Sequence, residues 1–301
     1  MAKIVVTKNL QLLPDQIKRI KSLGEAVIYN DNVFSKEEWL KRCDEGEIIC
    51  SSSGFRDEIY ELKDKFFSLP FVNVKWLDKK RLKERNITVS YAPGSNKEAV
   101  AEWVISMLLT LFRNFSSLTN IENAPVDEVL KETQGLTGKS AAILGKGNIG
   151  KEVGKICKAF RMKVKYFERG KNLYQVVKNA DAIINCLSTN NETIGLLDGK
   201  FFNSLKKGSR FITFTDQRIC DDKELLRALE EGILAGAAHD AGSSFVGRTD
   251  HPLYKNLLGH SKLIITPHIA YNTDYSNRKV NDMMIDNIEA WIKGKPINLL
   301  D

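Results

Sequence analysis

A glycine-rich turn carries the most specific chemical signal in the sequence. Residues 141–144 have the pattern of a buried strand, residues 145–150 read G-K-G-N-I-G, and residues 151–160 have a helical pattern. In G-x-G-x-x-G the first glycine permits a tight turn, the second lets backbone approach a pyrophosphate, and the third permits close helix packing. N–H groups at a helix start also favour a phosphate. We therefore expect dinucleotide contacts from Gly145, Gly147, Asn148, Ile149 and Gly150.

An acidic residue follows the next strand pattern. Residues 163–167 look like a strand that ends at Glu168, at roughly the twenty-residue separation where a carboxylate meets the adenosine ribose. A carboxylate accepts hydrogen bonds from a 2′-hydroxyl and repels a 2′-phosphate, so the predicted cofactor is NAD. Arg169 and Lys171 could soften the repulsion, which leaves NADP as the alternative. The simpler interpretation is a turn that only packs a helix, with Glu168 a surface residue.

Composition limits the class of protein. A chain of 301 residues with 43% hydrophobic content suits two domains, each with its own core. No leader pattern is recognised at the start, and the apolar run 104–112 is too short to span a bilayer. The scattered cysteines predict neither disulfides nor a zinc site; they are Cys43, Cys50, Cys157, Cys186 and Cys220. We expect a cytoplasmic protein that does not interact with membranes.

The formal net charge of +7 raises the question of nucleic-acid binding. Basic residues alternate with acidic ones, as in residues 36–38 and 79–85, and no aromatic residues are interleaved to form a stacking surface. A solvated helical surface explains these charges better, so we predict no nucleic-acid partner.

Strand and helix patterns alternate along most of the chain. Residues 3–7, 26–29 and 47–51 are strand-like, and residues 13–23 and 36–43 are helical. A long apolar helix over residues 97–113 follows the turn at Pro93-Gly94, and a new strand–helix series begins at Ser140. This alternation predicts an α/β fold with parallel sheets, in which the long helix leads into a second domain.

Several segments resemble the D-2-hydroxyacid dehydrogenase family, which includes phosphoglycerate, glycerate and D-lactate dehydrogenases. The resemblance is dense from about Ile87 to Ala270. It is carried by N-I-T-V with A-P-G-S-N-K-E-A-V-A-E at 86–102, L-T-G-K at 136–139, G-I-L-A-G-A-A at 232–238, D-H-P-L at 250–253 and T-P-H-I-A at 266–270.

The resemblance implies a Rossmann NAD-binding domain over residues 99–271. It also implies a flavodoxin-like substrate domain made of residues 1–98 and 272–301, and a homodimer formed through the cofactor domains. Ser53 and Gly54 would offer backbone N–H groups to a substrate carboxylate, unless they form an ordinary turn. The further cofactor contacts that it implies are Phe214, Asp216 and Asp240, with Asp240 near the nicotinamide carboxamide.

The family's catalytic set is only partly present. His268, in T-P-H, matches the histidine that acts as general acid and base. Asp216 stands where the family has the arginine that binds the substrate carboxylate, and Arg218 lies two residues further on. Phe245 stands where the family has the acidic partner of the histidine, and Asp216 could replace that partner. His239 and Cys186 are expected to line the cleft rather than to catalyse.

Two functions remain open at this point. The first is an NAD-dependent oxidoreductase that transfers hydride between nicotinamide and a small 2-hydroxy or 2-oxo acid, or an altered substrate, with His268 as acid and base. The second is a catalytically degenerate homologue that binds NAD and acts as a cofactor sensor or scaffold. The substitutions at Asp216 and Phe245 favour the second, and the retained His268 and Asp240 favour the first.

Overall fold

The computed structural model describes residues 2–52, 56–115, 133–240 and 262–300. The chain forms two compact units. Unit 1 contains Met1–Asn96 and Thr273–Asp301, and unit 2 contains Lys97–Asn272. Each unit is built around one parallel sheet, which confirms the predicted α/β fold with two parallel sheets.

Unit 1 has a five-stranded parallel sheet in the order β2-β1-β3-β4-β5, which is the flavodoxin-like order. Its strands are β1 (Lys3–Val6), β2 (Glu25–Ile28), β3 (Ile48–Cys50), β4 (Lys65–Ser68) and β5 (Ile87–Ser90). Its helices are α1 (Pro14–Leu23), α2 (Lys36–Asp44), the 3₁₀ helix η1 (Glu58–Glu61), α3 (Lys79–Glu84) and α12 (Asp274–Ile292).

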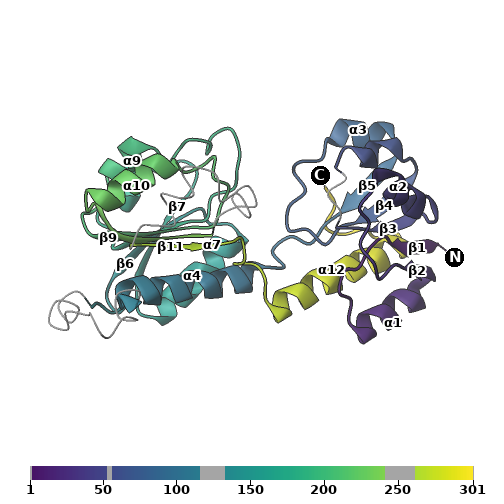
Figure 1. Cartoon of the computed structure of the whole chain (residues 1–301), viewed down its shortest axis with the longest axis horizontal. Coiled ribbons are helices and arrows are strands. Elements are labelled where there is room, and N and C mark those ends of the chain that lie inside the picture. Colours follow the sequence, from purple (N-terminus) through teal and green to yellow (C-terminus); the bar gives the residue numbers. More distant parts are fainter. Residues whose placement is uncertain (1, 53–55, 116–132, 241–261, 301) are drawn as a thin grey trace. The chain divides into compact units, whose positions relative to one another are not determined.

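Both faces of this sheet are buried because successive side chains alternate between them. In β1, Val5 packs in a core with Trp39 of α2. Ile4 packs in the opposite core with Ile20 of α1 and Met284 of α12. The last helix of the chain therefore completes the core of the unit that contains the N-terminal residues (Figure 1).

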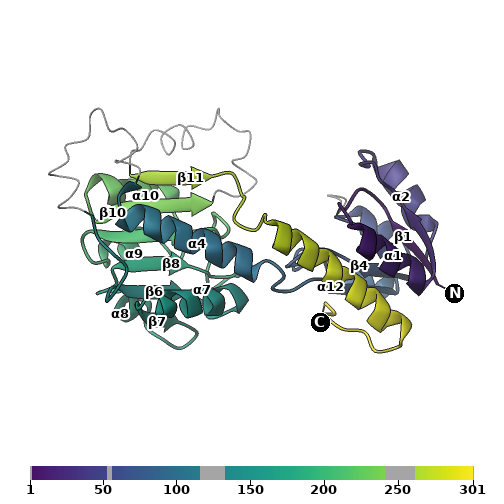
Figure 2. The same ribbon diagram turned by 90° about the horizontal axis from the view of Figure 1, so that it is seen from below.

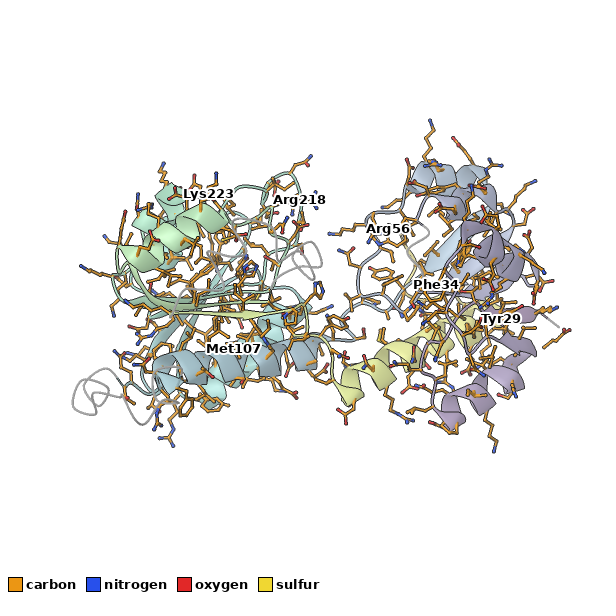
Figure 3. The ribbon with its side chains drawn as sticks, viewed as in Figure 1. Tyr29, Phe34, Arg56, Met107, Arg218 and Lys223 are labelled. Atoms are coloured by element: carbon orange, nitrogen blue, oxygen red, sulfur yellow. The ribbon has the colours of Figure 1, made fainter. Side chains whose placement is uncertain are left out.

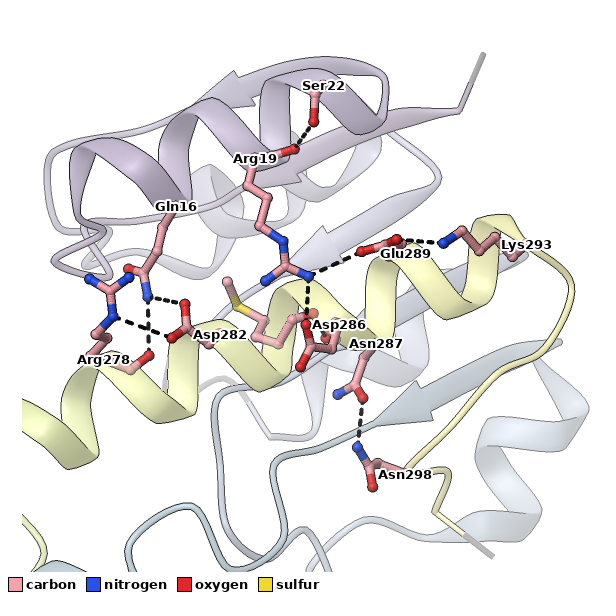
Figure 4. A network of polar contacts seen from close by, with 12 residues as sticks. Gln16, Arg19, Ser22, Arg278, Asp282, Asp286, Asn287, Glu289, Lys293 and Asn298 are labelled. Atoms are coloured by element: carbon pink, nitrogen blue, oxygen red, sulfur yellow. Dashed lines mark hydrogen bonds and ion pairs between the residues drawn. The ribbon is translucent and has the colours of Figure 1, made fainter.

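Polar contacts hold α12 to α1 along their shared edge (Figure 4). Arg19 donates to Asp286 at 2.5 Å and to Glu289 at 3.1 Å, and Gln16 donates from Nε2 to Asp282 at 2.7 Å. Most of these ion pairs are solvent-exposed and contribute little individually. Gln16 is 1% exposed, so its paired amide also fixes the register of the two helices.

Unit 2 has a six-stranded parallel sheet in the order β11-β10-β9-β8-β6-β7. The strands are β6 (Ser140–Leu144), β7 (Lys163–Phe167), β8 (Ala182–Asn185), β9 (Ser209–Thr213), β10 (Leu234–Asp240) and β11 (Leu263–Thr266). The helices are α4 (Lys97–Phe112), α7 (Asn148–Ala159), α8 (Leu173–Val177), α9 (Gly199–Asn203) and α10 (Asp222–Glu230).

Helices cover both faces of the second sheet. Figure 1 shows α4 and α7 on one face and α9 and α10 on the other, and Figure 2 shows the same unit from below. The α4 side is packed with Val104, Leu108 and Ile143. The α9 side is packed with Phe201 and Phe211, among others. These doubly covered strands explain the nearly continuous apolar runs in the sequence.

Most predicted elements differ from the structure by a residue or two at their ends. The informative difference is α7, which begins at Asn148 inside the glycine motif and not at Lys151. The motif's last three residues therefore form the first helical turn. Among the described helices, none combines the length and apolar character needed to cross a membrane.

Candidate functional site

The candidate site lies at the carboxyl edge of the unit 2 sheet. All of its strands are parallel, so the segments that follow them emerge at the same edge. The chain runs from β6 to β7 on one side and then continues to β8 on the other. In open α/β sheets, ligands bind in the crevice outside the carboxyl ends at such a switch in strand order.

The glycine turn after β6 has the geometry that a pyrophosphate site needs. Gly145 has φ +101°, and a Cβ there would lie 2.7 Å from the carbonyl oxygen of Cys186. A Cβ on Gly150 would lie 2.2 Å from the carbonyl oxygen of Gly145, so this position packs helix against strand. A Cβ on Gly147 would meet no protein atom within 4 Å. Packing explains two glycines, and Gly147 leaves open space at the start of α7.

The open space beside Gly147 shows that the residues present fit a dinucleotide. Gly147 is the N-cap of α7 and has no side chain to accept from the helix's first N–H groups. An anion in the space beside Gly147 would accept hydrogen bonds from these N–H groups and interact favourably with the helix dipole. Asn148 and Ile149 supply N–H groups of the first turn.

Glu168 follows β7 and lies in a basic environment. Its carboxylate accepts from Lys171 Nζ at 2.8 Å and lies 3.4 Å from Lys146 Nζ. The hydrogen bond from Lys171 is the main cause that lowers the pKa of this carboxyl, with Lys146 adding to the effect. Arg169 pairs with Glu192 at 2.9 Å. Glu168 is therefore an ionised acceptor held between two lysines.

A buried amide ties the ends of β8 and β9 together. Asn185 is fully buried, and its Nδ2 donates to Thr213 Oγ1 at 3.1 Å and to Thr215 Oγ1 at 2.7 Å. Its Oδ1 accepts from Leu187 N at 3.2 Å. The segment after β9 is thus anchored immediately before Asp216.

Asp216 and Arg218 form an ion pair within one turn. Arg218 Nε donates to Asp216 Oδ1 at 3.0 Å, and Nη2 donates to Oδ2 at 2.6 Å. The Arg218 backbone is also fixed, because its N–H donates to Asp216 Oδ1 and its carbonyl accepts from Gly195 N at 2.8 Å. The hydrogen bond from Arg218 is the main cause that lowers the pKa of Asp216. The carboxylate is therefore neutralised by its neighbour, and the Arg218 side chain is 63% exposed. Figure 3 shows where Arg218 lies.

His268 lies in the turn after β11 and its side chain is exposed. Its backbone is left-handed, with φ +54°, and its N–H donates to Thr266 O at 3.1 Å. The imidazole meets the Tyr271 ring edge-on at a centroid distance of 5.4 Å. Asp240, at the end of the neighbouring strand β10, bonds to this turn at Thr266 Oγ1, Ile269 N and Ala270 N.

Other predicted positions fall near this edge or outside the described part of the chain. Phe214 follows β9 and meets the Trp103 ring edge-on at 6.5 Å. Ser53, Gly54 and Phe245 lie outside the described residues. Cys186 follows β8, and burial raises the pKa of its thiol.

His239 is 1% exposed within β10, and its Nδ1 lies 3.9 Å from an oxygen of Asp222. Burial raises the pKa of Asp222 to about 7 and lowers the pKa of His239 to about 4. All five cysteines are free thiols. No group of three or more histidine, cysteine or acidic residues within the described ranges could hold a metal ion.

Sequence reasoning missed three contributors to this edge. Lys146 occupies a variable position of the glycine motif, and its contact with Glu168 depends on the pairing of β6 with β7. Asn185 could have been found from the sequence, because it is the polar residue that ends the apolar strand β8. Thr266 is the first residue of T-P-H, and no local pattern indicates that its hydroxyl bonds to Asp240.

Comparison with known proteins agrees with this geometry. The sequence profile of the D-isomer specific 2-hydroxyacid dehydrogenases, for their NAD binding domain, matches residues 105–270. A hydroxypyruvate reductase of Blautia hydrogenotrophica is 27% identical, and the similarity covers 99% of this chain and 99% of that protein.

Two solved structures share the fold across both units. D-mandelate dehydrogenase of Rhodotorula graminis superposes with a TM-score of 0.84 at 18% identity, covering 100% of this chain and 97% of that one. An NAD complex of a D-isomer specific 2-hydroxyacid dehydrogenase of Lactobacillus delbrueckii ssp. bulgaricus gives 0.82 at 20% identity, covering 99% and 100%.

Proposed function

Because this chain belongs to the D-isomer specific 2-hydroxyacid dehydrogenases, we propose that it is an NAD-dependent oxidoreductase that interconverts a small 2-oxo acid and its 2-hydroxy acid. The observation that carries the proposal is the carboxyl edge of unit 2, where the open turn at Gly147 and the exposed His268 belong to the same edge of one sheet. A hydroxypyruvate reductase among the relatives supports a small 2-oxo acid as substrate.

We assign the acid–base step to His268. When bound, the nicotinamide cofactor supplies or accepts the hydride. The His268 imidazole donates a proton to the carbonyl oxygen during reduction and takes it from the hydroxyl during oxidation. Its exposed side chain is accessible to a substrate. The alternative is a sensor or scaffold that binds NAD without catalysis. In that alternative the exposed imidazole of His268 would transfer no proton.

We assign the recognition of the substrate carboxylate to Arg218, with Asp216 as the residue that orients it. The contacts with Asp216 use Nε and Nη2, which leaves the N–H groups of Nη1 to donate to a carboxylate. Asp216 then does not repel the substrate, since its charge is balanced by Arg218. This arrangement offers the function of the family's missing arginine from a position two residues later.

The two units have different roles in this proposal. Residues 99–271 bind NAD, and residues 1–98 with 272–301 form the substrate domain, where Ser53 and Gly54 would contact the carboxylate. The division of the chain after Asn96 and Asn272 supports these boundaries. Phe214 and Asp240 would line the nicotinamide end. The protein would act as a homodimer in the cytoplasm, where a reducing environment suits its free thiols.

The test is reduction of a panel of 2-oxo acids by NADH and by NADPH, followed at the nicotinamide absorbance. We expect turnover with NADH for pyruvate, glyoxylate or hydroxypyruvate. Arg218→Gln should raise KM for that acid by about tenfold to a hundredfold, because a charged hydrogen bond to the carboxylate is lost.

Arg227→Gln is the matched control, since Arg227 is also paired with acidic residues in unit 2 but lies on α10. It should leave KM unchanged. Absence of turnover with every acid, alongside tight NADH binding, would support the sensor alternative. An unchanged KM in Arg218→Gln would remove Arg218 from the site while leaving the proposed reaction standing.

A further inference from the structure

One buried carboxylate holds the turn that carries His268. Asp240 is 4% exposed, and its Oδ1 accepts from the Thr266 hydroxyl at 2.5 Å and from Ile269 N at 2.9 Å. Its Oδ2 accepts from Ala270 N at 2.9 Å. The donors lie on both sides of His268 in the chain, so a single side chain fixes the entry to the turn and its exit.

The backbone at His268 needs such support. Its φ of +54° lies in the left-handed region, which is unfavourable for a residue with a Cβ and persists where the surroundings fix it. Pro267 precedes it, and the Thr266 carbonyl accepts the His268 N–H. Strand pairing brings the two ends of the clamp together, because Asp240 is the register partner of Thr266.

We infer that Asp240 is a positioning residue, which acts by clamping the Thr266–Ala270 turn so that the His268 imidazole is held at the reacting carbonyl. The inference rests on the proposed acid–base role of His268. It is separate from the expected role of Asp240 as a partner of the nicotinamide carboxamide, because it acts through three donors of the protein itself. A buried side chain whose oxygens accept several hydrogen bonds is held in one orientation.

The two roles predict different kinetic effects. A clamp acts on the histidine, so loosening it lowers kcat and leaves the dissociation constant of NADH unchanged. A carboxamide contact acts on the cofactor, so its loss weakens NADH binding. Misplacement of a reacting group by an ångström can lower a rate by about a hundredfold, and a partly loosened clamp should therefore lower kcat by roughly tenfold.

Thr266→Val is the sharpest variant, because it removes one hydroxyl donor to Asp240 and keeps the shape of the side chain. We expect kcat to fall by about tenfold, NADH affinity to stay within twofold, and the Ile269 and Ala270 amides to exchange hydrogen faster. Thr266→Ser restores the hydroxyl and should restore kcat. Thr110→Val is the matched control, since its hydroxyl bonds to the Ser106 carbonyl on α4, at 2.8 Å, and plays no part in the site.

Asp240→Asn provides a second measurement in case Thr266→Val or Thr266→Ser is unstable. It should lower kcat more than it weakens NADH binding. Weaker NADH binding with kcat unchanged would overturn the clamp in favour of the carboxamide contact. Unchanged kcat in Thr266→Val, despite faster amide exchange, would also overturn it.

A wild-type protein that reduces no 2-oxo acid would instead contradict the proposed function and remove any catalytic role for the clamp. The exchange rates of Ile269 and Ala270 would then still show whether Asp240 holds the turn. The two failures are therefore distinguishable.

Discussion

Two turns at the same sheet edge reach a left-handed backbone by different means. After β6, Gly145 has φ +101°, and glycine adopts this conformation without steric strain. After β11, His268 has φ +54° and is held by a carboxylate from the neighbouring strand. The first turn is specified by its own residues. The second depends on a partner distant in sequence, which holds a residue with a Cβ in a conformation that favours glycine.

The largest effect should come from replacing His268, to which we assign the acid–base step. His268→Asn removes the proposed acid–base group, and asparagine tolerates a positive φ better than most residues, so the turn should survive. We expect kcat to fall by about 10²- to 10⁴-fold. Steady-state kinetics with the best 2-oxo acid would measure this.

NADH affinity and thermal stability should stay unchanged in His268→Asn, since the imidazole is exposed and the glycine turn is untouched. A variant that keeps most of its kcat would show that another group transfers the proton. A fall in stability instead of kcat would show that His268 serves the fold.

The next largest effect should be a loss of NADH affinity when the glycine turn after β6 is changed. Gly147→Val places a side chain in space that no protein atom fills, so folding should be preserved while the pyrophosphate is excluded. We expect NADH affinity to fall at least about a hundredfold, measured by calorimetry. Gly150→Val should instead lower the melting temperature, because its Cβ would lie 2.2 Å from Gly145 O.

Gly135→Val is the matched control, because a Cβ there also meets no atom within 4 Å and the position lies outside the motif. It should bind NADH like the wild type. Equal affinity in Gly147→Val and Gly135→Val would contradict the cofactor site after β6.

The difference between the turns also explains what the sequence could predict. The glycine spacing and Glu168 are local signals with fixed separations, so the order of strand, glycine turn, helix and second strand was predictable from the residues alone. The contacts from Asp240 to Thr266, Ile269 and Ala270 join positions 26, 29 and 30 residues apart. No local pattern encodes them, because they depend on β10 pairing with β11.

The same contrast between local and long-range signals applies to the fold. Alternating strand and helix patterns predicted parallel sheets, whereas the strand orders were implied only by the family resemblance. The pair Asp216 and Arg218 was visible as two residues of opposite charge. Its mutual orientation was not, because it depends on a turn closed by the hydrogen bond from Ile219 N to Asp216 O.

A smaller effect should separate backbone from side-chain recognition within the cofactor edge. Glu168→Ala removes the expected acceptor for the ribose hydroxyls and releases Lys146 and Lys171, which both contact Glu168. We expect NADH affinity to fall by roughly tenfold and NADPH affinity to stay unchanged or rise, measured by calorimetry. Equal losses for the two cofactors would mean that Glu168 does not face the ribose.

The smallest effect concerns a second buried carboxylate near the clamp. Asp240 is stabilised by three donors, whereas Oδ1 of Asp222 has no hydrogen-bond partner within the described structure. Burial accordingly raises the pKa of Asp222 from 3.8 to about 7. Burial lowers the pKa of neighbouring His239 from 6.5 to about 4. Between about pH 4 and 6.5, the two groups should affect the free energy of unfolding in opposite directions.

The signs follow from proton binding in the folded and unfolded states. In this range Asp222 keeps a proton that the unfolded chain has lost, so its contribution to stability falls as pH rises. His239 lacks a proton that the unfolded chain has gained, so its contribution rises with pH. Each slope is at most about 1.4 kcal/mol per pH unit, and the two cancel in the wild type.

Each single substitution should expose the slope of the other residue. Relative to the wild type, Asp222→Asn should make the free energy of unfolding rise from pH 4 to 6.5, and His239→Gln should make it fall over the same interval. Urea unfolding at several pH values would measure both, and the double variant should again match the wild-type slope. Two single variants that both follow the wild-type profile would show that neither shift exists. That result would mean that water or local opening of the structure solvates Asp222. Asp222 would then not be an unsatisfied buried carboxylate, in contrast to Asp240.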